Sequence, residues 1–337
     1  MHNVCKDCFS DKEIIGLITS QANIGNCDFC DKTNIEVINI SELLDFFKEL
    51  LDNFQHKGNG ENLKVKIQGN WNLFSNLDSA YKVLNYVIQN IDTEITNADE
   101  LVDFNNDILE NVNYWNILKD QLKWEKRYLT NINILTDDLG WDSFFNSQIV
   151  LNHTSEFFRA RLHHIESENP YENEKMYCPP KGVSTAGRAN PAGIPFLYLS
   201  DNKETILYEI RASYLDEISI GTFSLKNTIT NEIKISDFTE NQTIFHPNKV
   251  NEKIKSTLLK RQISHDLSKP MRRYDSELDY IPTQFICEFI KIFTGVHGIK
   301  FRSSLHTTGN NLVIFDQNIM ECKSVEKVKI KKVKITA

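Results

Sequence analysis

Four residues in the second half of the chain have the side chains needed to break a bond between a ribose and a base. They are Arg188, Tyr198, Glu209 and Ser303. A carboxylate near the reacting carbon stabilises the positive charge of an oxocarbenium-like transition state. The planar fork of an arginine binds phosphate oxygens in pairs, an aromatic ring suits a flat base, and a hydroxyl orients a ribose or phosphate oxygen. This chemistry requires no metal ion.

Each of these residues also has a plainer interpretation when it is considered alone. Arg188 fits a solvated loop, and Tyr198 fits a buried strand with one hydrogen bond for its hydroxyl. Glu209 fits the surface of a helix, and Ser303 fits a turn. Only their occurrence together favours a site.

The order and surroundings of these residues resemble the RES domain family, which is named for its Arg, Glu and Ser. Arg188 lies in a glycine-bounded loop, Gly187–Gly193, where the backbone can approach a ligand closely. The segment Phe157–Ala160 resembles the opening strand of the family and contains Arg159, and Gly309–Phe315 resembles the closing strand.

The resemblance implies a compact α/β fold similar to ADP-ribosyltransferases and cleavage of the nicotinamide–ribose bond of NAD. The activity would be that of an NAD glycohydrolase, or of an NAD phosphorylase with phosphate as co-substrate. The resemblance also implies roles for individual residues. Catalysis falls to Arg188, Glu209 and Ser303, and NAD binding falls to Arg159, Tyr198 and Asn311.

Many RES proteins are the toxin half of a toxin–antitoxin pair, so the resemblance also implies an antitoxin or a trigger protein as partner. The chain departs from the family at Ala189, where relatives place an aromatic residue, and in a long insertion between Glu209 and Ser303. Two alternatives stay open: transfer of ADP-ribose to a macromolecule, and a nucleotide-sensing module without turnover. A module that only binds has no need for the carboxylate of Glu209.

A competing motif is the spacing Arg159-x4-His164, which fits the Arg-x4–6-His pattern of HEPN ribonucleases. That motif requires a helix, whereas the segment around Arg159 has the pattern of a strand. His163 and His164 are therefore expected near the surface or behind the site.

Four of the seven cysteines form two pairs near the N-terminus, Cys5-x2-Cys8 and Cys27-x2-Cys30. This spacing is typical of a structural zinc site with four thiolate ligands and no open coordination position. The alternatives are four unrelated reduced thiols or a redox pair. Cys178, Cys287 and Cys322 stand alone and are expected to be packing residues.

The composition of the 337 residues is that of an ordinary globular protein, with 40% hydrophobic and 25% charged residues. The net charge of −8 makes nucleic acid an unlikely partner. No apolar run approaches the roughly 20 residues of a membrane span, and the N-terminus lacks the pattern of a signal peptide. These features predict a cytoplasmic protein that does not bind membranes, and they leave a homo-oligomer open.

Composition and periodicity predict an α+β protein with three parts: a zinc-binding segment with four cysteines at 1–40, a helical domain at 41–150 and a mixed α/β domain at 151–337. The resemblance implies that the last part is a RES domain and that the helical part is a HEPN-like domain. The helical domain resembles the cysteine-bearing domain often fused ahead of RES.

Helices are expected at 41–54, at 76–91 and around 114–124, and a polar loop at 56–60 is expected to end the first of these helices. Another helix begins near Asp201, carries Glu209 at the margin of its apolar stripe, and has Glu204 in a capping pair. Strands are expected at 196–199, 218–223 and 312–315, and at 327–335, where alternating lysines fit a sheet edge.

Overall fold

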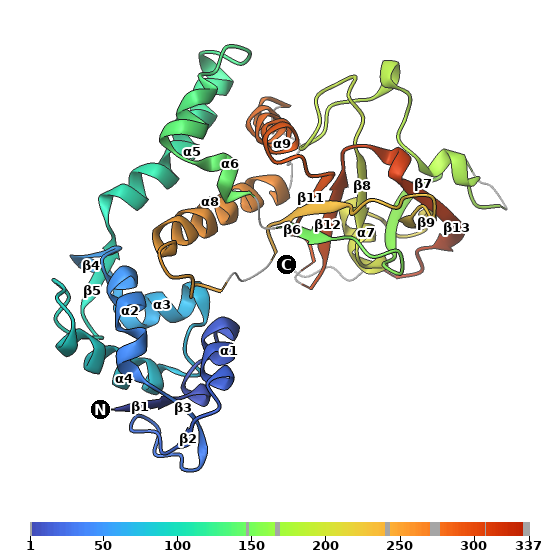
Figure 1. The fold of residues 1–337 in the computed structure, drawn as a ribbon. Helices are drawn as coiled ribbons and strands as arrows, with labels where there is room; N and C mark the ends of the chain where they lie inside the picture. Colours follow the sequence, from blue (N-terminus) through green and yellow to red (C-terminus); the bar gives the residue numbers. More distant parts are fainter. Residues whose placement is uncertain are drawn as a thin grey trace. The chain divides into compact units, whose positions relative to one another are not determined.

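The computed structural model describes residues 2–145, 148–165, 169–239, 243–269, 277–306 and 308–332. The chain divides into two compact units, which we call unit 1 and unit 2. Unit 1 contains residues 1–114 and 241–258, and unit 2 contains 115–240 and 259–337. The division falls inside two helices, α5 (Asn106–Trp124) and α8 (Val250–Ser268), so each of these helices contributes to both units (Figure 1).

Unit 1 combines helices with two small sheets. A three-stranded antiparallel sheet has the order β1-β3-β2, and β4 pairs with β5. The strands are β1 (Asn3–Cys5), β2 (Ile24–Gly25), β3 (Ile35–Asn39), β4 (Phe54–Asn62) and β5 (Leu101–Phe104). The helices that complete unit 1 are α1 (Lys12–Ser20), α2 (Leu44–Leu51), α3 (Leu63–Trp71) and α4 (Leu77–Asn90).

The carboxylate of Asp11 shows why residues 241–258 belong to unit 1. One oxygen accepts the backbone N–H groups of Glu13 and Ile14 and so caps α1. The other oxygen accepts the N–H of Ile244 at 2.9 Å and that of Phe245 at 3.3 Å. Asp11 is only 3% exposed, so these bonds also satisfy a buried charge.

Unit 2 is built on an eight-stranded mixed sheet with the order β13-β9-β7-β8-β12-β11-β10-β6. Only β10 and β11 pair in parallel, and the other neighbours pair antiparallel. The strands are β6 (Gln148–Val150), β7 (Phe157–Leu162), β8 (Leu197–Ser200), β9 (Glu217–Leu225), β10 (Lys234–Asp237), β11 (Gly298–Arg302), β12 (Asn310–Ile314) and β13 (Met320–Lys329). The helices of unit 2 besides the ends of α5 and α8 are α6 (Trp141–Phe144), α7 (Lys203–Glu209) and α9 (Ile281–Thr294).

This sheet brings together segments that are far apart in sequence. Strand β12 lies between β8 and β11, and Asn311 pairs with Ser200. The end of β8 leads into α7 and the end of β11 leads to Ser303, so the two segments expected to form the site follow the two strands that flank β12. Strand β13 lies at the edge of the sheet, as its lysines predict, and residues 333–335 of the expected strand lie outside the described residues.

Several expectations about local structure are confirmed. Helix α4 begins after Asn76, whose side chain accepts the N–H of Ser79, and its buried residues recur at helical spacing. Helix α5 contains the expected segment 114–124. The mixed α+β class is also confirmed.

Other local expectations are wrong. The polar segment His56–Gly60 is not a loop that ends a helix but part of β4, which accommodates it through an irregular register between His56 and Glu61. The helix expected at 41–54, with Ser41 as its capping residue, is a 3-10 turn at Ile40–Leu43 followed by α2, and the side chain that caps this turn is that of Asn39, which accepts the N–H of Ser41.

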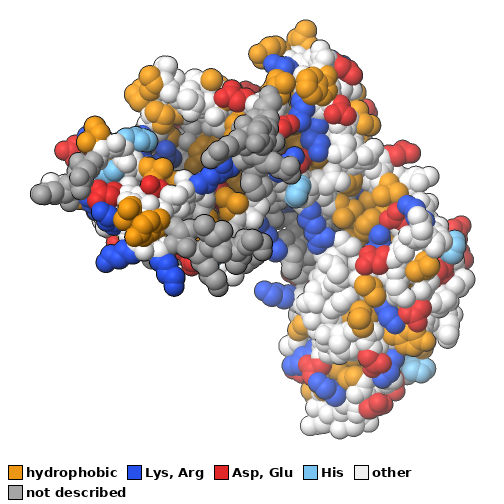
Figure 2. All heavy atoms as spheres, turned by 180° about the vertical axis from the view of Figure 1, so that it is seen from behind, with side chains coloured by type: hydrophobic (Ala, Val, Ile, Leu, Met, Phe, Trp, Pro, Cys, Tyr) orange, Lys and Arg blue, Asp and Glu red, His pale blue; other side chains and the backbone are white. Residues whose placement is uncertain are grey.

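Figure 2 shows Lys and Arg side chains interspersed with Asp and Glu side chains on the face that it draws. Such a mixture differs from the continuous basic surface of nucleic-acid-binding proteins. Among the described residues, no helix has the length and apolar character needed to cross a membrane.

Candidate active site and cysteine centre

Glu209 is the last residue of α7, and its position depends on where that helix begins and ends. The helix is capped by Asn202, whose side chain accepts the backbone N–H of Glu204 at 2.7 Å. The side chain of Glu204, which was expected to complete a capping pair, is not the group that caps the helix. Two residues after Glu209, Arg211 has φ of 54°, in the left-handed region. A non-glycine residue in that region cannot continue a right-handed helix, so α7 stops and leaves Glu209 in its final turn.

The carboxylate of Glu209 receives two hydrogen bonds on the same oxygen. Ser303 donates through Oγ at 2.7 Å, and Asn311 donates through Nδ2 at 2.8 Å, both to Oε1. Oε2 accepts no hydrogen bond from any residue that the structure describes. Three of the predicted site residues thus lie in direct contact, and Asn311 contacts the carboxylate of Glu209 itself.

Ser303 is oriented by its own loop. Its Oγ accepts the N–H groups of Leu305 and His306, both at 3.2 Å, and donates its proton to Glu209. The side chain is nearly buried, with 7% of its surface exposed. The hydroxyl therefore uses its one proton and both of its lone pairs in hydrogen bonds, and these bonds fix its position against the Glu209 carboxylate.

The ring of His306 ties the Ser303 loop to α7. Nδ1 lies 2.7 Å from Oγ1 of the buried Thr205, and the ring stacks on Tyr208 with centroids 5.3 Å apart. Gly309 makes this approach possible, because a Cβ at that position would collide with the Thr205 hydroxyl.

Arg188 lies in a loop that Tyr198 fastens to the sheet. The Tyr198 hydroxyl donates to Oδ1 of Asn190 at 2.7 Å and accepts the N–H of Ala189 at 3.0 Å. A Cβ on Gly187 would lie 2.6 Å from this hydroxyl, so the loop requires a glycine there. Burial raises the pKa of Tyr198, and its hydroxyl stays protonated. Its oxygen therefore supports the Arg188 loop.

The guanidinium of Arg188 is half-buried. Nη1 donates to the backbone carbonyl of Asp266 at 3.1 Å, and the group lies 5.5 Å from the centroid of the Tyr280 ring. Burial lowers the pKa of Arg188, and the charges of Tyr280 and Glu209 oppose that shift. An arginine stays charged under these conditions, so the site contains a cation that favours an anionic ligand.

Arg159 lies in β7 and supplies a second cation. Nη1 donates to the carbonyl of Tyr198 at 3.4 Å. The Nε atom is buried and has no acceptor among the described residues. Burial also lowers the pKa of Arg159. A buried donor without an acceptor is costly, and an anion would remove that cost.

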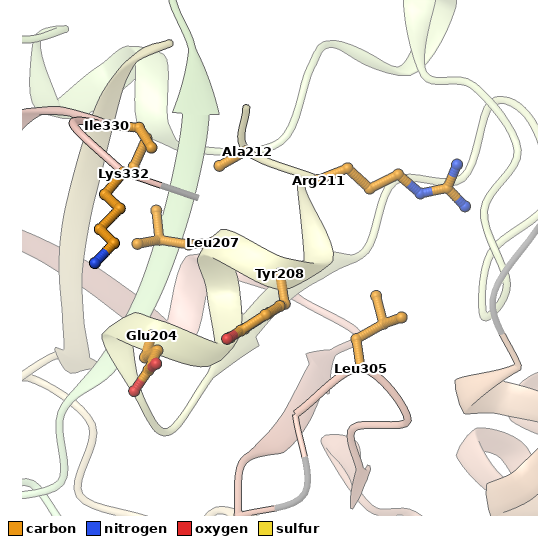
Figure 3. A pocket seen from close by; sticks show the side chains of 8 residues that line it. All are labelled: Glu204, Leu207, Tyr208, Arg211, Ala212, Leu305, Ile330 and Lys332. Carbon is orange, nitrogen blue, oxygen red and sulfur yellow. The ribbon is translucent and has the colours of Figure 1, made fainter. Parts of the chain in front are cut away.

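Two cavities lie close to these residues in unit 2. A polar cavity of about 260 Å³ is lined by Arg188 together with lysines and aspartates of α5 and α8 and with Asp279. A more apolar cavity of about 410 Å³ lies beside α7, where Leu207 and Ile330 face each other and Arg211 extends away (Figure 3). Glu209, Ser303 and Asn311 do not line this more apolar cavity.

The four cysteines of unit 1 form one cluster. Their sulfur atoms all lie within 4.8 Å of one another, with Cys5–Cys8 at 3.8 Å, Cys5–Cys30 at 3.4 Å and Cys8–Cys27 at 3.7 Å. Ligands at about 2.3 Å from a tetrahedral zinc ion are about 3.8 Å apart. The donor set and its spacing therefore fit a tetrahedral metal ion.

The cysteines of the cluster shift one another's pKa in opposite directions. Hydrogen bonds from the thiols of Cys5 and Cys8 lower the pKa of Cys27, while the hydrogen bond with Cys27 raises the pKa of Cys5 to about 12. One thiolate is thus stabilised by its neighbours, and further thiolates would repel it unless a positive ion stood among them.

The Arg159-x4-His164 interpretation finds no support in the fold. Arg159 lies in a strand, and His164 follows the end of that strand, so the helix that the motif requires is missing from this described segment. His163 instead contacts the Ser219 hydroxyl at 2.8 Å and stacks on Tyr171.

Sequence reasoning missed the residues that hold the site together. Asp266, Tyr280, Thr283 and Gln284 all contact the Arg188 loop, and His306 contacts α7. No spacing or motif distinguishes these residues, because each acts through a contact that only the fold creates.

The model of the RES domain family matches residues 157–335, which is more than half of the chain. Comparisons with curated proteins and with solved structures give no match. The expected similarity to ADP-ribosyltransferases and the HEPN-like interpretation of the helical part therefore stay predictions.

Proposed function

The chain belongs to the RES domain family, and we propose that it degrades NAD by breaking the nicotinamide–ribose bond. The proposal concerns the reaction and the residues that perform it. Glu209, Ser303 and Arg188 act in catalysis, with Arg188 as the clamp on the diphosphate. Arg159, Tyr198 and Asn311 bind the dinucleotide, and Asn311 also holds the Glu209 carboxylate.

The observation that carries the proposal is the arrangement around Glu209. Two donors, Ser303 and Asn311, bind one carboxylate oxygen and fix the plane of the group, while the other oxygen is left for a ligand. A carboxylate fixed in this way stabilises positive charge without having to reorganise during the reaction.

The two arginines support the choice of a diphosphate ligand. Nε of Arg159 is buried without an acceptor among the described residues, and Arg188 has further N–H groups beyond the one that donates to Asp266. Two guanidinium groups match the charge of a diphosphate, which joins the two halves of NAD.

In the proposed reaction the bond between the ribose carbon and the nicotinamide nitrogen breaks, and its electron pair leaves with nicotinamide. Glu209 stabilises the oxocarbenium character of the ribose, and Ser303 and Asn311 keep the carboxylate in place. Water then adds to the same carbon and releases one proton, which gives ADP-ribose. Inorganic phosphate in place of water gives ADP-ribose phosphate.

The test is nicotinamide release from NAD by the purified full-length chain, measured with and without inorganic phosphate. Release of nicotinamide with free ADP-ribose identifies a glycohydrolase, and release that depends on phosphate identifies a phosphorylase. Release accompanied by ADP-ribose attached to an added macromolecule identifies a transferase. Binding of NAD without any release would leave only the nucleotide-sensing alternative.

For the cysteine centre we propose a single zinc ion held by Cys5, Cys8, Cys27 and Cys30. Three of these side chains are buried and the fourth is half-buried, so the ion would have four protein ligands and a structural role. Elemental analysis of the purified chain tests the identity and the stoichiometry.

Enzymatic loss of NAD would harm a cell, so we propose that a partner restrains or triggers the enzyme, as in toxin–antitoxin or defence systems. Growth arrest and falling NAD on expression of the chain would support this proposal, and loss of both effects in the Glu209→Gln variant would tie them to the site. Normal growth with unchanged NAD would contradict it.

A further inference from the structure

The loop that carries Arg188 is held by a segment that has no part in the chemistry proposed above. That segment lies between Glu209 and Ser303 and includes the end of α8 and the first turn of α9. Gln284 of α9 donates through Nε2 to the carbonyl of Gly187 at 2.8 Å and to that of Asn190 at 3.0 Å. One side chain therefore fixes both ends of the turn around Arg188.

Thr283 fixes the middle of the same turn. Its Oγ1 donates to the carbonyl of Arg188 at 2.6 Å, and the residue is 2% exposed. The carbonyls of Gly187, Arg188 and Asn190 thus all point at the first turn of α9. Three bonds of this kind leave the backbone of the loop little freedom.

The guanidinium is held from the same segment. The carbonyl of Asp266 accepts Nη1 of Arg188, and the ring of Tyr280 lies under the group. Asp266 is itself fixed, because its Oδ2 accepts Nε1 of Trp115 at 2.7 Å and Nζ of Lys119 at 2.9 Å. Both the backbone and the side chain of Arg188 are therefore oriented by residues outside the predicted site.

We propose that Thr283 and Gln284 are positioning residues that preorganise Arg188 for the diphosphate of the dinucleotide. The inference rests on the proposed function for its ligand. Arginine has many rotamers and a loop has many backbone conformations, and binding is weaker when a ligand must order them. In this chain Thr283 and Gln284 already order the Arg188 loop in the folded protein, before any ligand binds. They therefore increase the affinity for the anionic part of the substrate. The opposite arrangement, in which the segment withholds Arg188 from the ligand, makes the opposite prediction for affinity.

The experiment uses the full-length chain with Gln284→Leu, which keeps the size of the side chain and removes both donors. Thr283→Val removes the other donor, and Thr283→Ser restores it. Glu288→Leu, one turn further along α9 at an exposed position, is the matched control for changes to the helix itself. Two readouts are needed: amide hydrogen exchange of Gly187 and Ala189, and the Kd and kcat for NAD.

For Gln284→Leu and Thr283→Val we expect faster exchange at both amides, an NAD affinity weaker by about tenfold, and a kcat within about twofold of the parent. Thr283→Ser and Glu288→Leu should match the parent in both readouts. Unchanged exchange or unchanged affinity in Gln284→Leu would overturn the inference, and tighter binding would show that the segment withholds Arg188. If the parent neither binds nor cleaves NAD, the proposed function fails. The exchange measurement still tests the inference in that case: faster exchange in Gln284→Leu shows that Gln284 holds the loop, and unchanged exchange shows that it does not.

Discussion

The cysteine centre of unit 1 and the glutamate site of unit 2 are built in opposite ways. The centre takes four identical ligand atoms from two short turns, and these atoms face one another within 4.8 Å. The glutamate site combines guanidinium, carboxylate, hydroxyl and amide groups from segments that lie between Arg159 and Asn311 in the sequence. Hydrogen bonds to other parts of unit 2 hold these groups in place.

The difference fits the structural role proposed for the cysteine centre and the reaction proposed for the glutamate site. In the centre every sulfur is directed at the other three, so a bound ion would be enclosed and closed to substrate. In the glutamate site Nε of Arg159 is buried without an acceptor among the described residues, and Oε2 of Glu209 accepts no hydrogen bond from any of them. A buried donor without an acceptor is costly in a folded protein, and such a group is expected where a ligand satisfies it.

Removal of the metal is expected to have the largest effect, and only on the centre. Structural zinc in small domains contributes on the order of 10 kcal/mol of apparent binding free energy at pH 7. Cys8→Ser should therefore lose the ion and lower the melting temperature of unit 1, as seen by calorimetry with elemental analysis. A variant that keeps its zinc and its melting temperature would contradict the proposed ligand set.

Cys287→Ser is the matched control, because Cys287 is a buried cysteine of unit 2 that lies apart from the cluster. It should keep the full zinc content. Loss of zinc from this variant as well would show that general unfolding, and not loss of a ligand, removes the ion.

Glu209→Gln is expected to have the largest effect on the reaction. The amide keeps the size of the side chain but removes the negative charge, which should lower the rate of NAD cleavage by about 10²–10⁴-fold. The zinc content and the melting temperature should stay at the parent values. Nicotinamide release at the parent rate would end the mechanism proposed for this site.

Glu204→Gln provides the control for Glu209→Gln. Glu204 lies on the same helix and is exposed, and its carboxylate is 3.9 Å from the His306 ring. We expect a change in rate of no more than a few-fold. A loss as large as that of Glu209→Gln would mean that α7, and not one carboxylate, is sensitive to charge.

The two regions also differ in how far the sequence predicts them. The cysteine cluster follows from spacing alone, because two residues three positions apart on a tight turn must direct their sulfurs to one point. The edge position of β13 follows from its alternating lysines in the same local way. That Glu209, Ser303 and Asn311 belong to one site could be inferred only from the resemblance to a family. Glu209 lies 94 residues before Ser303, and rules based on local spacing do not reach over such a distance.

The residues that support the site could not be predicted even with that resemblance. Gln284 and Asp266 lie in the long stretch of chain between Glu209 and Ser303, and their contacts with the Arg188 loop are made by one side-chain amide and one backbone carbonyl. A backbone carbonyl carries no sequence signal at all. The loop predicted at His56–Gly60 was wrong for a related reason, because pairing with β5 overrides the local preference for a loop.

Arg188→Lys should have a smaller effect than Glu209→Gln, and mainly on affinity. The ammonium of lysine is a point charge that cannot bind two phosphate oxygens in parallel or stack on Tyr280 as a guanidinium does. In a Glu209→Gln background, which prevents turnover, isothermal titration should give an NAD affinity weaker by roughly 10–100-fold. Unchanged affinity together with unchanged turnover in the parent background would return Arg188 to the status of a loop residue.

The smallest expected effect is at His306, which touches the site only through the Ser303 loop. His306→Ala removes the contact with the Thr205 hydroxyl and the stacking on Tyr208, each worth about 1 kcal/mol. The loop should then hold Ser303 less firmly against Glu209, and kcat should fall by about tenfold while the KM for NAD stays near the parent value.

His306→Asn separates the hydrogen bond from the stacking, because an asparagine retains a polar group near the position of Nδ1 and lacks the ring. If the hydrogen bond to Thr205 dominates, His306→Asn should recover most of kcat, and Thr205→Val should reproduce the loss seen in His306→Ala. If both His306 variants keep the parent kcat, Ser303 is held by its own backbone contacts with Leu305 and His306. The support of the carboxylate would then be local, like that of the cysteine centre, and the contrast between the two regions would be smaller than the structure suggests.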